Sequence, residues 1–210
     1  MHPYATDSAE RRLVPLYLTA ASIAAAFLLH KTLEGVIPWW IDAPSVAGFY
    51  AIFFVVFERW LWRLPFLHSS GLLRVPNLNG RWIGYVTSSF DGHATNHEAH
   101  LEIHQTWTGL SVCLKTDRSQ SRSLIGTITT ENPTAGTLSY EYINEPKANT
   151  VANMQIHRGT ARLDLITHDD RWVLEGEYYS GRGRQNFGTL RFEKPLREKA
   201  LNAPAKPAAI

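Results

Sequence analysis

The residues best suited to chemistry in this chain are aromatic and basic side chains in its second half. Tyrosine and tryptophan rings can stack on flat bases, and arginine guanidinium groups donate paired hydrogen bonds to phosphate oxygens. Together they could hold a ligand that carries both bases and phosphates. The candidate ligand-binding residues are Trp107, Arg118, Arg122, Tyr140, Tyr142, Arg158, Tyr178, Arg182 and Arg184.

Spacing indicates which of these candidates could face the same ligand. Tyr140 and Tyr142 lie two residues apart, so in a strand their side chains share one face. Arg182 and Arg184 lie in a turn bracketed by glycines, SGRGRQN, which could bring both guanidinium groups over the mouth of a barrel. The segment Thr116 to Ser123, TDRSQSRS, combines two further arginines with serine hydroxyls and could cradle a phosphate.

Each candidate also has an ordinary structural role. A strand tyrosine commonly packs in a core or across strands, and an arginine in a surface turn is commonly solvated. Trp107 could plug one end of a β-barrel, with Gln105 satisfying backbone groups at a bend. The candidates therefore define a cluster rather than a set of contacts.

Metal binding and catalysis find less support in the sequence. His97, His100 and His104 resemble metal-ligand spacing, but strand side chains alternate, so His97 points away from the other two. We therefore predict no metal site and no cofactor beyond the ligand itself. Nucleophile-elbow, phosphate-loop and zinc-protease motifs are absent from the sequence, which predicts that the chain is not an enzyme and has no catalytic residue.

Alternation of apolar and polar residues dominates the chain after residue 77. Leu101 and Ile103, for example, alternate with Glu102 and His104. Short strands joined by turns predict an all-β, antiparallel up-and-down barrel of about eight strands, which removes exposed edges and can enclose one small ligand. The strand candidates are Gly80 to Ser88, Glu98 to Gln105, Gly109 to Thr116, Ser121 to Thr130, Thr137 to Asn144, Asn153 to Arg158, Thr160 to Ile166, Arg171 to Tyr179 and Asn186 to Phe192.

Two apolar stretches precede this β domain, Leu13 to Leu29 and Ala43 to Trp62. Each is near the lower length limit for a helix that spans a bilayer, and tryptophans flank the stretches as they do at lipid headgroups. The composition of the C-terminal end, rich in Ala, Pro and Lys, is typical of disorder. The predicted organisation is a two-helix transmembrane hairpin at residues 1–64, a linker at 65–76, the barrel at 77–194 and a disordered tail at 195–210.

The distribution of charge predicts the orientation of the hairpin. Arg11 and Arg12 precede the first apolar stretch, and Arg59, Arg63 and Arg74 follow the second. The positive-inside rule then places the N-terminus and the barrel in the cytoplasm of a multi-pass inner-membrane protein. Acidic and basic residues nearly balance within the barrel, so it lacks the general basic surface that binding of DNA or RNA requires.

Five segments follow the two membrane stretches in a distinctive order: PNLNGRWIGYVTSS, IHQTWTGLSVCLKTDRSQSRS, LSYEYINEP, HRGTARLDL and LEGEYYSGRGRQNFGTLRF. This combination, over roughly residues 13–193, resembles the SMODS-associating two-transmembrane β-strand-rich effectors of bacterial CBASS antiphage defence. The resemblance implies an eight-stranded barrel that binds a cyclic dinucleotide made by a partner nucleotidyltransferase, a CD-NTase. It also implies homo-oligomerisation of the hairpins in the lipid bilayer, loss of membrane integrity and death of the infected cell.

Two other classes of function are compatible with the residues alone. A membrane-anchored barrel of lipocalin type would bind an apolar small molecule, and its cavity would lack paired arginines. A membrane-tethered hydrolase acting on nucleotides or lipids would need a convergent acid and base, which the sequence does not reveal. The leading hypothesis is the cyclic-dinucleotide-gated membrane effector.

Overall fold

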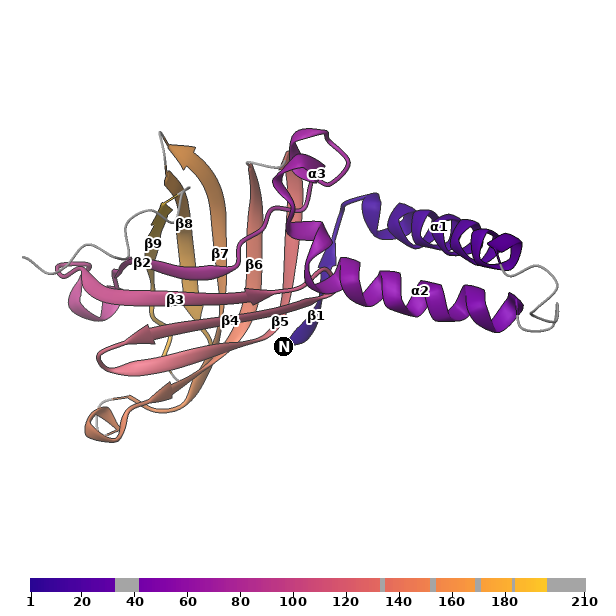
Figure 1. Ribbon diagram of the computed structural model, residues 1–210. Helices are drawn as coiled ribbons and strands as arrows, with labels where there is room; N and C mark the ends of the chain where they lie inside the picture. The colour runs from indigo at the N-terminus through magenta and orange to yellow at the C-terminus, as the bar shows by residue number, and fades with distance from the viewer. Residues whose placement is uncertain (33–41, 133–134, 152–153, 169–170, 183, 196–210) are drawn as a thin grey trace, which may run out of the picture.

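The chain folds into two long helices followed by a closed β-barrel, which confirms the expected fold class (Figure 1). This computed structural model describes residues 1–210 except 33–41, 133–134, 152–153, 169–170, 183 and 196–210, so the expected tail lies almost wholly outside the described residues. In chain order the elements are β1 (His2–Thr6), α1 (Glu10–Thr32), α2 (Asp42–Arg59), η2 (Leu61–Arg63), α3 (Pro65–Ser69), β2 (Gly80–Val86), η3 (Ser89–Asp91), β3 (His97–Gln105), β4 (Gly109–Thr116), β5 (Ser119–Asn132), β6 (Ala135–Pro146), η4 (Ala148–Thr150), β7 (His157–His168), β8 (Arg171–Ser180) and β9 (Phe187–Pro195).

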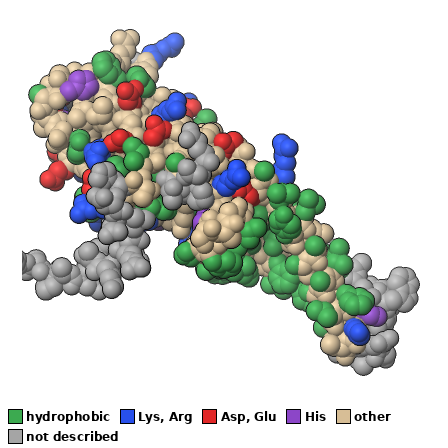
Figure 2. All heavy atoms as spheres, turned by 90° about the horizontal axis from the view of Figure 1, so that it is seen from above, with side chains coloured by type: hydrophobic (Ala, Val, Ile, Leu, Met, Phe, Trp, Pro, Cys, Tyr) green, Lys and Arg blue, Asp and Glu red, His purple; other side chains and the backbone are tan. Residues whose placement is uncertain are grey.

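Helices α1 and α2 lie side by side and project from one end of the barrel (Figure 1). Both are long and apolar enough to span a membrane, over Glu10–Thr32 and Ser45–Arg63. Ser22 is buried in α1, where its hydroxyl donates to the Leu18 carbonyl at 2.6 Å and so leaves no unpaired polar group in an apolar contact. Large apolar side chains face outward along both helices, and Figure 2 shows the apolar surface that they form, which suits contact with lipid.

Strands β2 to β9 follow one another around the barrel, and antiparallel pairing of β2 with β9 closes it. Side chains alternate between the interior and the surface, as the period-two pattern predicts. The interior end beside the helices is filled by Trp62, Trp82 and Trp107, whose side chains are exposed by only 0%, 0% and 2%. The barrel is therefore a packed core at this end and not a pore.

Strand β1 lies between β4 and β5 and was not anticipated from the sequence. It pairs antiparallel with β4 at Gly109 and Leu110, and parallel with β5 from Gly126 to Ile128. The sequence-based division assigned residues 1–64 to the hairpin, but residues 2–6 belong to the barrel sheet. A five-residue strand, HPYAT, is too short for its alternation to be distinguished from a loop.

The gap that β1 fills arises from divergence of its neighbours. β4 and β5 pair directly from Cys113 to Lys115, at the end away from the helices, and their pairing ends at Arg122. Directly after this point, between Ser123 and Ile125, the pairing of β5 with β6 shifts its register. At the point of separation the Ser123 hydroxyl accepts from the Val112 amide at 2.9 Å and lies 2.8 Å from Nε2 of His2. Tyr4 then enters the core with 7% exposure.

This connection determines where the two ends of the hairpin lie. β1 immediately precedes α1, and the segment after α2 leads directly into β2, so both ends of the hairpin meet the same barrel. Figure 1 shows the chain leaving the barrel along α1 and returning to it along α2. Both ends of the hairpin therefore lie at the same end of the barrel.

Two further segments differ from the sequence-based expectation. The candidates Asn153 to Arg158 and Thr160 to Ile166 are replaced by the single strand β7, which pairs with β6 without interruption through Gly159. The expected linker is ordered, because α3 begins at Pro65 and Leu73 and Val75 are exposed by only 2% and 0%. The hairpin therefore joins the barrel through packed residues.

Replacement of the tyrosine in β1 tests whether this strand supports the barrel. Tyr4→Ala removes a large buried side chain, which typically costs about 3 to 5 kcal/mol in the free energy of unfolding. We expect faster amide hydrogen exchange in the full-length protein at Gly109–Val112 and Ile125–Ile128, measured by mass spectrometry. Tyr17→Ala, at an α1 tyrosine exposed by 61%, is the matched control and should leave both segments protected. Equal exchange in the two variants would contradict a structural role for β1.

Candidate ligand cavity

A small cavity lies inside the barrel at the end away from the helices. β6 and β8 reach this end at Pro146 and Ser180, after starting beside the helices. The cavity has a volume of about 100 Å³. Its polar lining residues are Thr116, Ser119, Ser121, Tyr140, Tyr142, Asn144, His157, Tyr178, Ser180 and Arg184. Apolar side chains complete the lining, namely Val86, Leu114, Met154, Ala161 and Leu190. The distal half of the barrel interior thus combines polar and apolar groups, whereas the half beside the helices is apolar.

Three tyrosines form the aromatic wall of the cavity. The ring centroids of Tyr140 and Tyr142, both on β6, are 6.2 Å apart, and Tyr178 joins them from β8. Burial raises the pKa of Tyr142 to about 12 and raises the pKa of the other two as well, so all three remain neutral at physiological pH. Ser180 beside Tyr142 and Ser88 beside Tyr178 partly offset this rise in pKa.

Arg184 brings positive charge to the cavity from the turn between β8 and β9. Burial, with the positive charge of Arg118 as a lesser cause, lowers the pKa of the Arg184 guanidinium below its ordinary value. Both guanidinium groups approach the ring of Phe90, at 5.6 Å from Arg184 and 6.0 Å from Arg118 to the ring centroid. Two like charges that share one ring repel each other, so an anion bound between them would be stabilised.

Hydrogen bonds hold the turn that carries Arg118. Its carbonyl accepts from the Lys147 amide at 2.9 Å and from the Thr150 hydroxyl at 2.7 Å, both in the η4 region. Lys147 Nζ also donates to the Thr116 carbonyl at 2.8 Å. These bonds join the β4–β5 turn to the β6–β7 connection, so the two segments form one rim of the cavity mouth.

The structure brings together about half of the residues that the sequence nominated. Tyr140, Tyr142, Tyr178 and Arg184 line the cavity, and Arg118 lies at its mouth over Phe90. The serine-rich segment also contributes, because Ser119 and Ser121 line the cavity from β5. A cavity with tyrosine rings and two guanidinium groups near it therefore lies at one end of the barrel.

The remaining nominated residues do not line this cavity. Arg122 and Arg158 point out of the barrel because of their register on β5 and β7. On the outer surface, Arg122 forms an ion pair with Glu145 at 3.3 Å and Arg158 with Glu141 at 3.9 Å. Arg182 is exposed in its turn, although it lies only two residues from the half-buried Arg184. Trp107 is at the other end of the barrel, where the alternative role as a plug fits its position.

Sequence reasoning missed several residues of the site. Asn144 and His157 line the cavity from facing positions on β6 and β7, and Met154 lies beside them, with its sulfur 3.4 Å from the Asn144 side-chain nitrogen. Asn144 continues the inward register of Tyr140 and Tyr142, so strand parity could have found it. Strand parity could not have identified Phe90, because this residue lies in the short helix η3 and not in a strand.

The opposite end of the barrel is joined to α2 by a cluster of polar and aromatic contacts. Glu58 Oε1 accepts hydrogen bonds from the hydroxyls of Thr106 and Thr108, which flank the β3–β4 turn, at 2.5 and 2.7 Å. Between these threonines, Trp107 packs edge-on against Phe57 of α2, with ring centroids 5.3 Å apart. The β3–β4 turn is therefore fixed to the end of α2.

Further contacts strengthen this junction from both sides. Arg63 donates to the Gln105 carbonyl at 2.9 Å, and Gln105 Oε1 accepts from the Leu78 amide at 2.8 Å, the structural role foreseen for this glutamine. Arg11 of α1 lies over the rings of Tyr4 and Trp107, at 4.4 and 5.0 Å from the ring centroids. Both helices are thus held by the same strand turn.

The described residues contain no group of three or more His, Cys, Asp or Glu side chains that could hold a metal ion. His97 pairs with Asp91 at 3.0 Å near the cavity mouth. His100 and His104 lie on the other register of β3, on the opposite side of the sheet from Leu101 and Ile103, which are buried. The histidine spacing is therefore that of a strand with one buried face.

Comparisons with known proteins agree with this arrangement of a barrel on a hairpin. Residues 73–194 match the family model of the Cap15 cyclic dinucleotide receptor domain, and residues 12–63 match that of the Cap15 TM helices. A CD-NTase-associated protein 15 from Yersinia aleksiciae is 32% identical over 151 residues, covering 70% of this chain and 67% of the relative. Another from Staphylococcus schleiferi is 28% identical over 159 residues, covering 74% and 80%. The family expected from the sequence is confirmed: the chain belongs to the Cap15 effectors of CBASS, in which transmembrane helices precede a cyclic dinucleotide receptor domain.

Proposed function

We propose that the distal cavity binds a cyclic dinucleotide supplied by a partner CD-NTase, and that binding drives the hairpins to associate and disrupt the inner membrane. The observation that carries this proposal is the pair Arg184 and Arg118 over Phe90, next to the tyrosine wall. Guanidinium groups suit the two phosphates of such a ligand, and the tyrosine rings suit its bases. Apolar side chains also line the cavity, but the charge of Arg184 and the hydroxyl groups beside it support this ligand over the apolar molecule of a lipocalin-like barrel.

The size of the cavity requires the mouth to open. Pockets for small ligands usually measure about 300 to 1,000 Å³, whereas this cavity measures about 100 Å³. A whole cyclic dinucleotide therefore enters only if the rim segments separate. The η4 region and the turn that carries Arg184 are the segments whose movement would widen the mouth, because strand pairing holds the surrounding wall.

Strands β3 and β4 offer a route from the cavity to the membrane. Leu114 and Thr116 of β4 line the cavity, and the opposite end of the same strand leads into the turn held by Glu58. A ligand shifts an equilibrium only by binding one state more tightly than another. We infer that the ligand favours the associated state by changing the position of this β4 end, and through it the position of α2.

Small residues on the outer face of the hairpin favour association between chains. On α1, Ser22 and Ala26 are buried within the hairpin, whereas Ala20, Ala21 and Ala24 are exposed. On α2 the exposed small residues are Ala47, Gly48 and Ala51. Such stripes let helices of neighbouring chains approach closely in lipid, where packing rather than the hydrophobic effect drives association.

The arginine substitutions that remove charge from the cavity test the ligand site. Arg184→Ala and Arg118→Ala should each weaken binding of the synthase product to the full-length protein in detergent by about tenfold to a hundredfold. That range corresponds to loss of a charge-assisted hydrogen bond worth about 1.5 to 3 kcal/mol. Isothermal titration calorimetry measures the effect. Arg122→Ala and Arg158→Ala are matched controls that should keep wild-type affinity, because these arginines face outward. Wild-type affinity in both cavity variants would exclude this cavity as the site.

Enlarging the exposed small residues of α1 tests the association step. The double replacement Ala20→Leu with Ala24→Leu should leave ligand affinity unchanged but abolish depolarisation of the inner membrane, because the bulkier stripes keep hairpins apart. A membrane-potential dye reports depolarisation in cells that express the effector with an active synthase. Ile23→Phe, which enlarges an α1 side chain exposed by 55%, is the control and should retain activity. Full depolarisation by the double variant would argue against association through this face.

Reporter fusions test the orientation. The arginines that flank the hairpin, together with a ligand made in the cytosol, predict a cytoplasmic barrel. Alkaline phosphatase folds only in the periplasm, so a fusion after Ile210 should be inactive, whereas a fluorescent protein at the same position should fluoresce. Because β1 ties the N-terminus to the barrel, a fusion before Met1 should report the same side. Phosphatase activity at either end would reverse the predicted orientation.

A further inference from the structure

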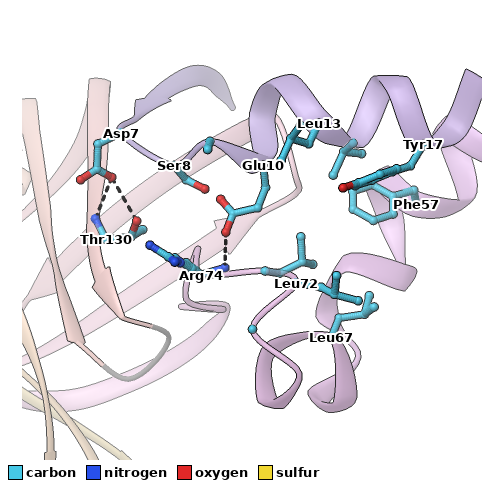
Figure 3. A pocket seen from close by; sticks show the side chains of 14 residues that line it. Asp7, Ser8, Glu10, Leu13, Tyr17, Phe57, Leu67, Leu72, Arg74 and Thr130 are labelled. Carbon is cyan, nitrogen blue, oxygen red and sulfur yellow. Dashed lines mark hydrogen bonds between the residues drawn. The ribbon is translucent and has the colours of Figure 1, made fainter.

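A second cavity lies outside the barrel, where the hairpin meets it. It has a volume of about 420 Å³ and lies between the start of α1, the segment after α3 and the end of β5 (Figure 3). Its apolar wall is formed by Leu13, Val14, Tyr17, Phe57, Leu67 and Leu72. The cavity lies at the opposite end of the barrel from the tyrosine wall, and nothing in the proposed nucleotide site uses it.

One corner of this cavity holds buried acceptors that lack partners. Glu10 is exposed by only 7%, and its Oε1 accepts from the Arg74 amide at 2.9 Å. Among the described residues its Oε2 has no hydrogen-bond partner, and neither has the Ser8 hydroxyl, which is exposed by 8% as a residue. Figure 3 shows both groups at the same corner, in the segment that joins β1 to α1. A buried carboxylate without a donor is costly, so this corner favours a cationic hydrogen-bond donor.

The position of the cavity identifies where such a donor comes from. The first candidate membrane span begins at Glu10 itself, and the second ends at Arg63, so the cavity lies where the helices enter the bilayer. Leu72 and Phe66 beside it are exposed by 55% and 60%, as suits residues at a lipid surface. An apolar wall with a charged corner at this depth matches a phospholipid, with its acyl chain on the wall and its headgroup at the corner.

We propose that this junction cavity binds a phospholipid whose headgroup carries a primary ammonium. The three N–H donors of the ammonium pair with Glu10 Oε2 and the Ser8 hydroxyl. The adjacent phosphate meets the guanidinium of Arg74, an exposed residue that lines the same cavity. A quaternary ammonium has no N–H to donate, and an uncharged headgroup leaves the carboxylate unpaired, so both bind more weakly.

This proposal is independent of the nucleotide site, since it requires only that the helices lie in a bilayer. In this proposal the junction binds one class of lipid selectively, and the lipid ammonium neutralises the buried carboxylate of Glu10 at the start of α1. A bound lipid would also bridge β1, α1 and the segment after α3, the elements that join hairpin to barrel.

The test measures lipid selectivity in the full-length protein in detergent micelles. Dihexanoyl phosphatidylethanolamine is titrated against dihexanoyl phosphatidylcholine, and bound lipid is counted by native mass spectrometry. The ethanolamine lipid should bind at least about tenfold more tightly, as expected when a charge-assisted hydrogen bond is made by only one of the two. O-phosphoethanolamine, which has the headgroup without the acyl chains, should not bind detectably. Equal binding of the two lipids overturns the proposal, and equal binding of the free headgroup overturns a lipid as the occupant.

Substitutions in the cavity test the contacts of the ammonium and of the phosphate separately. Glu10→Gln should abolish the preference for ethanolamine over choline, whereas Arg74→Ala should weaken both lipids alike because both carry the phosphate. Leu13→Trp narrows the cavity at a side chain that is 41% exposed, and it should reduce lipid binding even if Glu10→Gln proves unstable. Glu98→Gln, at an exposed carboxylate on the barrel, is the control and should preserve the preference. A preference that survives in Glu10→Gln, or undiminished lipid binding in Leu13→Trp, overturns the assignment.

Discussion

The pairing of β1 with β4 and β5 is the constraint on which the rest of the structure depends. These two strands diverge after their direct pairing ends at Arg122, and the divergence would expose unpaired backbone if β1 did not fill it. Because β1 leads directly into α1, the residues that complete the barrel also position the first membrane helix. The barrel and the hairpin are therefore one packed unit, and a displacement of β4 or β5 reaches the helices without passing through a flexible connection.

The interior of the barrel is divided along its axis into a densely packed end and an end that contains the proposed ligand cavity. Beside the helices, tryptophan and leucine side chains fill the space, and burial of large apolar groups supplies most of the stabilisation. At the far end hydroxyls, an amide and tyrosines share the lining of a small cavity with apolar side chains such as Leu114 and Leu190. Polar groups there retain hydrogen-bonding capacity for a ligand, and Arg184 bears the cost of a partly buried charge. The half beside the helices is therefore the densely packed part of the core, and the cavity lies in the other half.

Two glutamates at the junction tie the helices to the rest of the chain and differ in their surroundings. Glu58 accepts from both threonines of the β3–β4 turn, which fixes α2 to the barrel. Glu10, on α1, satisfies one backbone amide and leaves its second oxygen facing the junction cavity. Among the described residues, each of these carboxylates keeps one buried oxygen, Oε2, without a hydrogen-bond partner. Their surroundings differ, because Glu58 lies against the β3–β4 turn, whereas Glu10 lines the junction cavity, where the ammonium of the proposed lipid would meet it.

Local patterns in the sequence were sufficient for the class of fold, the two membrane stretches and the tyrosine pair on β6, because hydrophobic length and period-two alternation are properties of consecutive residues. They could not decide which arginines face the cavity. Arg118 and Arg184 come from different turns and meet over Phe90 only after the barrel closes, while Arg122 is turned outward by strand register. Long-range strand pairing likewise determines the position of β1 in the sheet and the burial of Trp107 at the end of the barrel beside the helices. Neighbouring residues determine local periodicity, but only closure of the sheet brings distant turns together at one mouth and the N-terminus into the barrel wall.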